Sequence, residues 1–332
     1  MNRSPLVALL IGLALAVGVA LWCGLADVAG ALAQAGWLGL LAVSAFHLVP
    51  KALCGAAWWT LLPRGSGGGL AGAIGFRWLR DAANDMLSVV PAAGELAAIR
   101  AMALRGIPAR LGAASTIIDL TVEMAAQCGF IALVLALLVV VRPDAGVIVP
   151  AAVGLAIMAS LLGGLVVAQR LGAFRLVDRV VTALSRDLGT ALALQLDGLQ
   201  ATIRALYAAR RRLAGAFALH LSAWVIGVGE GWIGLTMMGV SVGWLDVVML
   251  ETCAFILRSA GFMLPGAIGI QEGGYVLLAP LIGIPADAAL ALSLLKRGRE
   301  IVLGVPGCVA WQWLEGGRLW RAGDAAALKR GL

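Results

Sequence analysis

Long apolar stretches alternate with shorter polar segments along this chain. The apolar stretches are rich in Ala, Leu and Val, and each can supply the roughly 20 residues that a membrane-spanning helix needs. Because lipid offers no partners for free backbone amides, we expect them to be helical. The pattern predicts an all-α, polytopic integral membrane bundle with about six spans. The predicted spans are residues 5–25, 37–62, 111–141, 145–168, 213–239 and 288–314.

Two of the polar segments match each other. Every member of the second set lies 177 residues after its counterpart in the first. Chance is one explanation in a chain rich in Ala, Gly, Leu and Ile, but a shared Gly-Ile-Pro-Ala favours an internal repeat. Carboxylates, glycines and prolines are costly in hydrocarbon, so matching interruptions in two halves predict a substrate site where the repeats meet. The sets are Glu95, Gly106-Ile107-Pro108-Ala109 and Glu123, and Glu272, Gly283-Ile284-Pro285-Ala286 and Glu300.

The segments that carry these interruptions, residues 70–108 and 245–285, are too polar for simple spans. Each combines several charged residues with Pro and Gly. Broken helix at membrane depth is tolerated only where protein or water covers it. We therefore predict two re-entrant hairpins, each entering and leaving by the same face of the membrane.

Charge places the chain in the membrane. Residues 170–212 hold eight arginines against three aspartates, which is +5 of the net +7. Since Arg and Lys gather on the cytoplasmic side, we expect this loop and both chain termini to be cytoplasmic. Apolar residues at helical spacing between 176 and 184 predict an amphipathic helix along the inner surface.

In this threading the spans 37–62 and 213–239 cross the membrane in opposite directions. Residues 37–141 and 213–315 then form two inverted repeats, joined by residues 145–212, within one membrane domain of residues 1–332. Inverted repeats are common in secondary transporters, because exchanging the conformations of the two halves switches the side of access.

Composition excludes several classes of protein. The chain is 61% hydrophobic and 13% charged, with a mean hydropathy of +0.97, whereas about 25% charged residues is usual in soluble domains. The positive charge is explained by topology and does not indicate nucleic-acid binding. The five cysteines stand singly in apolar stretches, so they indicate neither disulfides nor a zinc site. The first 25 residues lack a convincing cleavage site and are expected to stay as a helix.

Charged residues within the predicted spans are the first candidates for function. Asp119 and Glu123 lie four apart and share one face of a helix. The corresponding helix of the second repeat carries Lys296, Arg297, Arg299 and Glu300. Isolated charges at this depth cost about 2.5–3.5 kcal/mol each, so they should be paired or solvated. We expect the two acids to meet these basic residues across the pseudo-two-fold axis, either as a substrate site or as an ion-pair lock between the halves.

Glu95 and Glu272 follow Pro and Gly at points where a helix would restart. A carboxylate there can simply cap the helix. It can also act as a proton or cation site or pair with Arg100 or Arg258, and the free amides can instead cradle an anionic headgroup.

Other polar residues give weaker signals. His47 and Lys51 lie four apart and could relay protons, although a packed neutral histidine is the favoured interpretation. Asp81 and Asp85 are faintly similar to a magnesium-diphosphate site, but a solvated turn is favoured. We expect no metal and no cofactor, since no His, Cys and carboxylate spacing indicates a metal site.

The stretch from Arg80 to Glu123, with Ser88-Val89-Val90-Pro91-Ala92-Ala93-Gly94-Glu95, resembles the membrane domain of lysylphosphatidylglycerol synthases. Pro265-Gly266-x-x-Gly269-x-x-Glu272 resembles the second motif of that family. The family is broad and includes stand-alone flippase-like proteins, and the sequence also resembles its hopanoid-biosynthesis-associated members. One departure is the missing Gly directly after Pro91. Carried over by position, the functional residues are Arg80, Glu95, Arg100, Asp119, Arg258, Glu272 and Arg297.

The resemblance implies a lipid transporter of the bacterial inner membrane that moves an amphipathic lipid between leaflets. Hopanoids and anionic or aminoacylated phospholipids are candidate cargo. Lipid aminoacylation is not expected, since no soluble synthase domain is present, and the protein is expected not to be an enzyme. The alternatives are a membrane enzyme that modifies a lipid and a non-catalytic subunit of a lipid-synthesis complex. Expected partners are membrane lipids, a second copy of the chain or lipid-biosynthesis proteins.

Overall fold

The computed structural model describes residues 10, 17–19, 21–66, 68–90, 92–144, 146–171, 198–260 and 267–330. Most of these residues are helical, and no strand occurs among them, as the apolar pattern predicts. The helices are α2 (Leu25–Leu61), α3 (Gly69–Met86), α4 (Ala93–Leu104), α5 (Ala109–Val141), α6 (Ile148–Leu171), α9 (Leu199–Ala208), α10 (Arg210–Met237), α11 (Trp244–Ala260), α12 (Ile270–Leu278) and α13 (Ala286–Arg330), with a 3₁₀ turn, η2 (Ala279–Ile282), after α12.

Among the described helices, α2, α5, α6 and α10 are long and apolar enough to cross a membrane. They correspond to four of the six predicted spans. The predicted span 288–314 lies within α13, which also carries a cluster of charged residues and Pro306. Most of the predicted first span, the predicted amphipathic helix between residues 176 and 184, and residues 261–266 lie outside the described ranges. The chain is therefore an all-α integral membrane protein, and the re-entrance of the two hairpins stays a prediction.

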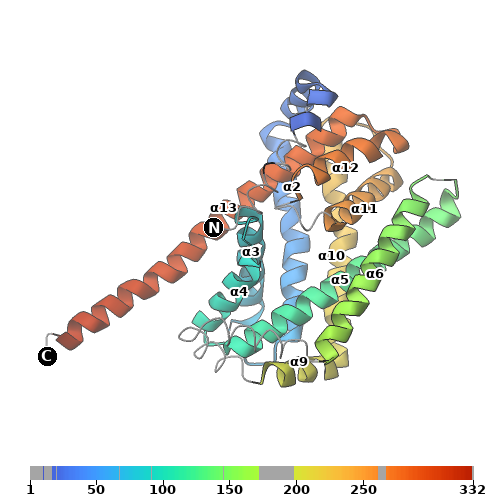
Figure 1. The fold of residues 1–332 in the computed structure, drawn as a ribbon. Coiled ribbons are helices and arrows are strands. Elements are labelled where there is room, and N and C mark those ends of the chain that lie inside the picture. Colours follow the sequence, from blue (N-terminus) through green and yellow to red (C-terminus); the bar gives the residue numbers. More distant parts are fainter. Residues whose placement is uncertain are drawn as a thin grey trace.

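Helices α2 and α10 form the centre of the bundle and run antiparallel (Figure 1). Gly39 lies against Met237 and Gly229 lies against Phe46, so residue numbers rise along one helix as they fall along the other. A Cβ on Gly229 would stand 2.7 Å from the Phe46 ring. Small residues thus let the two backbones approach closely, as is common between helices in membranes.

The repeated Gly-Ile-Pro-Ala has the same structure in both places. Gly106 and Gly283 have φ values of 81° and 79°, and the next amide, of Ile107 or Ile284, donates to a carbonyl five residues back at 3.0 Å. This geometry ends a helix at a left-handed residue, which glycine adopts without a steric penalty. The following proline fixes φ for the start of α5 or α13.

The helix bounds also repeat at the offset of 177. Helices α4 and α12 begin at Ala93 and Ile270, and α5 and α13 begin at Ala109 and Ala286. Each half therefore contains a long central helix, a hairpin (α3–α4 or α11–α12) and a second long helix. The extent of the two repeats as domains, residues 37–141 and 213–315, stays a prediction.

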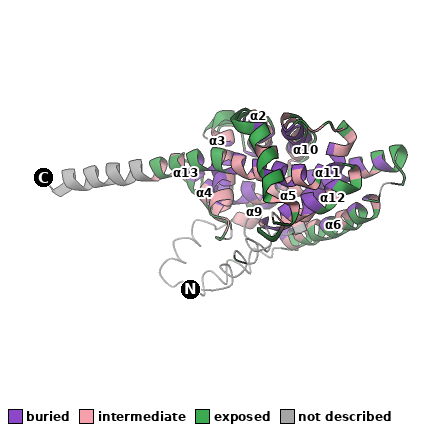
Figure 2. Ribbon diagram, turned by 90° about the horizontal axis from the view of Figure 1, so that it is seen from above, coloured by how far each residue is buried: buried purple, intermediate pink, exposed green. Residues whose placement is uncertain are grey.

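Buried residues gather in the middle of the bundle and exposed ones line its outer faces (Figure 2). The outward side chains of α6 are apolar, among them Val149, Val153, Ile157 and Leu161. In water such a surface would be costly, whereas in a bilayer it meets lipid chains. The polar side chains are turned inward instead, where they surround the candidate site.

Candidate functional site

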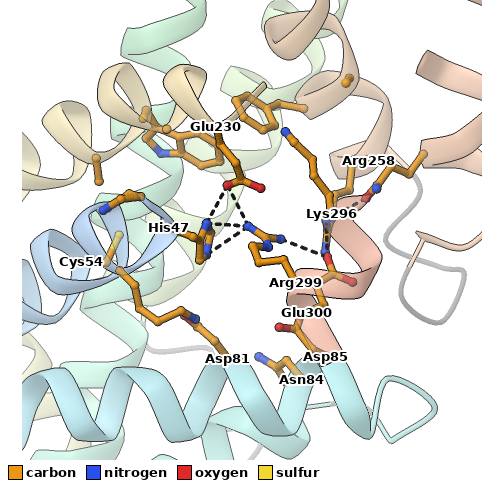
Figure 3. Close-up of a pocket in the computed structure, with 18 of the residues that line it drawn as sticks. His47, Cys54, Asp81, Asn84, Asp85, Glu230, Arg258, Lys296, Arg299 and Glu300 are labelled. Carbon is orange, nitrogen blue, oxygen red and sulfur yellow. Dashed lines mark hydrogen bonds and ion pairs between the residues drawn. The ribbon is translucent and has the colours of Figure 1, made fainter. Parts of the chain in front are cut away.

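A cavity of about 300 Å³ lies inside the bundle (Figure 3). Side chains from α2, α3 and α5 line it together with side chains from α10, α11, α12 and α13, so both halves of the chain contribute. The lining is partly apolar, with Trp224, Phe255 and Tyr275. The ionisable side chains that line it are His47, Lys51, Cys54, Arg77, Asp81, Asp85, Glu123, Glu230, Arg258, Tyr275, Lys296, Arg299 and Glu300.

In the first half, two arginines of α3 hold two carboxylates of α5. Arg77 donates to both oxygens of Glu123, at 2.6 and 3.0 Å. Arg80 donates to Glu123 at 2.8 Å and to Asp119 at 2.9 Å. Planar guanidinium groups suit such bidentate contacts with carboxylates. The hairpin is thereby fixed to the helix that follows it.

This first cluster extends to both central helices. Lys51 of α2 and Arg77 of α3 each contact Asp81, at 2.8 and 3.0 Å. His220 of α10 lies 3.0 Å from the fully buried Asp119. Lys51 gives only a weak functional signal in the sequence, but in the structure it is an ion-pair partner within the cavity wall.

In the second half, the fully buried Glu251 of α11 pairs with Lys296 of α13. Tyr275 of α12 donates to Glu251 at 3.1 Å, and Lys296 lies 3.0 Å from the Tyr275 oxygen. The lysine also lies 5.6 Å from the Tyr275 ring and 5.8 Å from Phe255, within cation–π range. Lys296, Tyr275 and Phe255 therefore form part of the cavity wall.

Glu230 joins the two halves. It lies in the apolar helix α10 between Gly229 and Gly231 and accepts from Arg299 of α13 at 3.0 Å. His47 of α2 lies 2.8 Å from the same carboxylate oxygen (Figure 3). The contact between His47 and Glu230 therefore crosses from the first half to the second at the cavity wall.

A third group surrounds Glu300. Arg258 of α11 donates to one oxygen of Glu300 at 2.9 Å, and Arg297 donates to the other at 3.0 Å. Arg297 also donates to Glu272 at 3.0 Å. The side chain of Arg258 is 38% exposed, much more than Lys51, Arg77, Lys296 or Arg299. Of these cavity cations, it is the one most open to an incoming group.

The predicted contact of Asp119 and Glu123 with Lys296, Arg297 or Arg299 is wrong. Their partners are the arginines of their own hairpin and His220, as given above. Lys296, Arg297 and Arg299 pair instead with acids of the second half. The reason is distance: each hairpin packs on the helix that follows it, so its charged side chains neutralise that helix first.

Glu95, Glu272 and Arg100 lie outside the cavity lining. Glu272 accepts from the amide of Gly269 at 2.6 Å and so caps α12, as well as accepting from Arg297. Glu95 accepts from Asn84 at 3.2 Å, and Asn84 instead caps the amide of Gly94. Neither glutamate contacts Arg100 or Arg258 in the structure.

The remaining predicted residue, Arg100, is 43% exposed and pairs with Glu315 at 2.7 Å near the end of the bundle. Arg80, Asp119, Glu123, Arg258, Lys296, Arg297 and Glu300 are brought together around the cavity, either in its wall or directly behind it.

Sequence reasoning missed Glu230 and treated Glu251 and Tyr275 only as parts of a polar hairpin or not at all. Glu230 carries a clear signal: it is one carboxylate inside an apolar stretch, and such residues are functional candidates by default. Asp81 and Asp85, assigned to a solvated turn, both line the cavity. Glu251 gives no separate signal, because its role depends on facing Lys296.

Cys54, Glu123 and His220 place one potential metal-binding atom each within 4.8 Å of one another. Their separation along the sequence gave no hint of this cluster. Both oxygens of Glu123 already accept from guanidinium groups. Two positive charges therefore stand beside the position of a metal ion, and this disfavours binding of a divalent cation.

A family model described as "Lysylphosphatidylglycerol synthase TM region" matches residues 9–307. The chain belongs to this family. No curated protein and no solved structure matches the chain significantly. The lysylphosphatidylglycerol synthase membrane region thus covers the central helices, both hairpins and the cavity. Membership indicates a membrane protein with a role related to lipids.

Proposed function

We propose that this protein moves an amphipathic lipid between the two leaflets of a membrane and leaves the lipid chemically unchanged. The observation that carries the proposal is the cavity, where charges of both signs from both halves of the chain lie inside a bundle with an apolar surface. Intramembrane charges of this kind mark substrate pathways in transporters.

The lining suits a polar headgroup. A volume of about 300 Å³ lies at the lower end of the range of small-ligand pockets, about 300–1,000 Å³. Cationic and anionic side chains both line it, so that a headgroup with a phosphate, an amine or hydroxyl groups finds hydrogen-bond partners. The acyl chains or the hopanoid rings would remain in the bilayer, against the apolar outer faces of helices such as α6.

The family and the lining of the cavity indicate the chemical class of the cargo. Hopanoids and anionic or aminoacylated phospholipids are the proposed cargo, the first because of the resemblance to hopanoid-associated members. Transfer would use a gradient or mass action.

The distribution of charge supports a bacterial inner-membrane location with cytoplasmic termini. At the end of the bundle where α9 lies, α2, α4 and α6 end and α5 and α10 begin (Figure 1). In the sequence, arginines stand at or next to these helix ends and in α9. Asp144, Asp246 and the pair of Arg142 with Asp246 lie at the other end, where α5 ends and α11 begins. By the positive-inside rule the arginine-rich end is cytoplasmic. The arginines are Arg64, Arg105, Arg110, Arg170, Arg204, Arg210, Arg211 and Arg212.

Reconstitution tests the proposal. Purified protein in liposomes with labelled phosphatidylglycerol, an aminoacylated phospholipid or a hopanoid should exchange at least one of them between leaflets. A double variant, Lys51→Gln with Asp81→Asn, removes an ion pair of the cavity without leaving an unpaired charge, since Arg77 keeps Glu123. Loss of charged hydrogen bonds worth about 1.5–3 kcal/mol should slow transfer about ten- to hundredfold.

The matched control is Arg142→Gln with Asp246→Asn, an ion pair at the end of the bundle and outside the cavity. It should transfer lipid at the wild-type rate. Equal rates for both double variants would contradict a path through the cavity. Chemical conversion of the lipid in detergent would instead indicate an enzyme.

A further inference from the structure

Asp85 differs from the other acidic residues of the cavity. Asp81, Glu123, Glu230 and Glu300 each form ion pairs. Asp85 lines the same cavity but has neither an ion pair nor a hydrogen bond to its side chain among the residues that the structure describes. It is only half-buried, on α3 next to Glu300 (Figure 3).

The charged groups that act most strongly on Asp85 come from four helices. They are Glu300 of α13, Asp81 of α3 itself, Arg258 of α11 and Lys51 of α2. Cys308 of α13 is also close. Lys51 is engaged by Asp81 at 2.8 Å, and Arg258 by Glu300 at 2.9 Å. The two cations near Asp85 therefore already have acidic partners.

Arg258 is the cation that an incoming anion can reach, because its side chain is 38% exposed. Glu300 does not depend on it, since Arg297 contacts Glu300 at 3.0 Å and Arg299 at 3.5 Å. Arg258 can therefore turn from Glu300 to a phosphate group. The phosphate would then stand in the cavity that Asp85 also lines, and the two negative charges would repel each other.

We propose that binding of a phosphate-bearing lipid at Arg258 is linked to uptake of one proton by Asp85. The proton comes from water and adds to a carboxylate oxygen, so that the negative charge brought by the phosphate is offset by the charge that Asp85 loses. This linkage deepens the proposed function. It rests on that function only where the bound lipid is taken to be the transported lipid. In a translocation cycle the linkage would move a proton together with the lipid.

Linkage fixes the sign of the effect. If binding takes up a proton, lipid affinity rises as pH falls, by up to about tenfold per pH unit, and proton binding is strengthened by lipid to the same degree. Asp85→Asn has no proton to accept and no charge to repel the phosphate. It should bind the lipid with an affinity that does not vary with pH and that exceeds the wild-type affinity at high pH.

The test is calorimetric titration of the purified protein with phosphatidylglycerol in detergent. Buffers of different ionisation enthalpy report the protons taken up, and a pH series reports the dissociation constant. The wild type should take up as many as about one proton per bound lipid, Asp85→Asn none, and Asp85→Glu should restore the uptake. Asp144→Asn, which replaces an exposed aspartate of the α5–α6 connection, is the matched control and should behave as wild type.

The outcomes of the titration either support the proposed proton linkage or overturn it. Binding without proton uptake, uptake that persists in Asp85→Asn, or no binding of phosphatidylglycerol at any pH would overturn it. Leaflet transfer by the wild type is measured in parallel with liposomes. Transfer without proton uptake overturns only the linkage, whereas proton uptake without transfer overturns only the proposed transport function.

Discussion

Both halves of the chain pair each hairpin with the next long helix through charged side chains, but they arrange the charges differently. In the first half the hairpin helix α3 supplies the cations Arg77 and Arg80, and α5, the long helix after the hairpin, supplies the anion Glu123. In the second half α11 supplies the anion Glu251, and α13, the long helix after the hairpin, supplies the cation Lys296. The packing of hairpin on helix is the same, and Arg258 of α11 with Glu300 of α13 keeps the polarity of the first half. The reversed polarity is confined to Glu251 and Lys296.

The reversed pair of Glu251 and Lys296 shows what these contacts require. A charge at membrane depth needs a neutralising partner within reach, and either sign can be placed on either helix. Asp119 and Lys296 occupy equivalent positions in the two repeats and carry opposite charges. We infer that these pairs mainly fix each hairpin to its helix, while the cavity between the halves faces the lipid headgroup.

The halves also differ in redundancy. Asp119 and Glu123 share two arginines and a histidine, whereas the partners of Lys296 are Glu251 and Tyr275. A network can lose one contact and keep its charges neutralised. An isolated pair cannot, so the second half should be the more sensitive to a single substitution.

The largest effect is expected for Lys296→Met. It leaves Glu251 fully buried without its cation, which costs about 3–5 kcal/mol of unfolding free energy. Adding Glu251→Gln removes the stranded charge and should recover most of the loss. Unfolding of both variants in mixed micelles, followed by tryptophan fluorescence, measures the difference. Equal instability of the single and double variants would show that packing, and not charge, decides.

Glu123→Gln should cost less, about 1–3 kcal/mol. Arg77 keeps Asp81 at 3.0 Å and Arg80 keeps Asp119 at 2.9 Å, so neither cation is left unpaired. The same unfolding measurement applies, with Lys296→Met as the reference. A loss as large as that of Lys296→Met would contradict the argument that the first cluster is redundant.

Sequence patterns could predict much of this fold. Apolar length predicts the helices that cross the membrane, and Gly-Ile-Pro-Ala predicts the break between each hairpin and its second long helix, because glycine and proline dictate backbone geometry locally. The offset of 177 recurs in the helix bounds for the same reason.

The partners of the charged residues could not be predicted in this way. Which cation meets Asp119 depends on how α3 and α5 are rotated and how closely they pack, and no local pattern encodes that. Arg77 and Arg80 stand in the sequence as two charges in a polar segment, equal in kind to Lys296 and Arg299. Only the packed helices show which pair lies within hydrogen-bond distance.

A smaller contrast is expected between the hairpins themselves. A Cβ on Gly94, at the start of α4, would lie 2.1 Å from the backbone oxygen of Arg80, whereas one on Gly273 of α12 meets nothing within 4 Å. Gly94→Ala should therefore lose about 1–3 kcal/mol through overpacking. Gly273→Ala should be neutral or stabilising by up to about 1 kcal/mol, because alanine favours helix. Equal effects would mean that the α3–α4 contact is looser than it is in the structure.

The smallest effect is expected at Arg100, a residue that the family resemblance places among the functional ones. It is 43% exposed and its partner Glu315 is 32% exposed, so water and salt screen the pair. Arg100→Ala should change the unfolding free energy by less than about 1 kcal/mol, and Glu315→Ala should do the same.

Neither side chain lines the cavity. Both variants should therefore transfer lipid at the wild-type rate, while Arg258→Ala, at the cavity, should transfer it more slowly. A slow Arg100→Ala with a normal Glu315→Ala would place Arg100 on the lipid path and extend that path beyond the cavity toward α4.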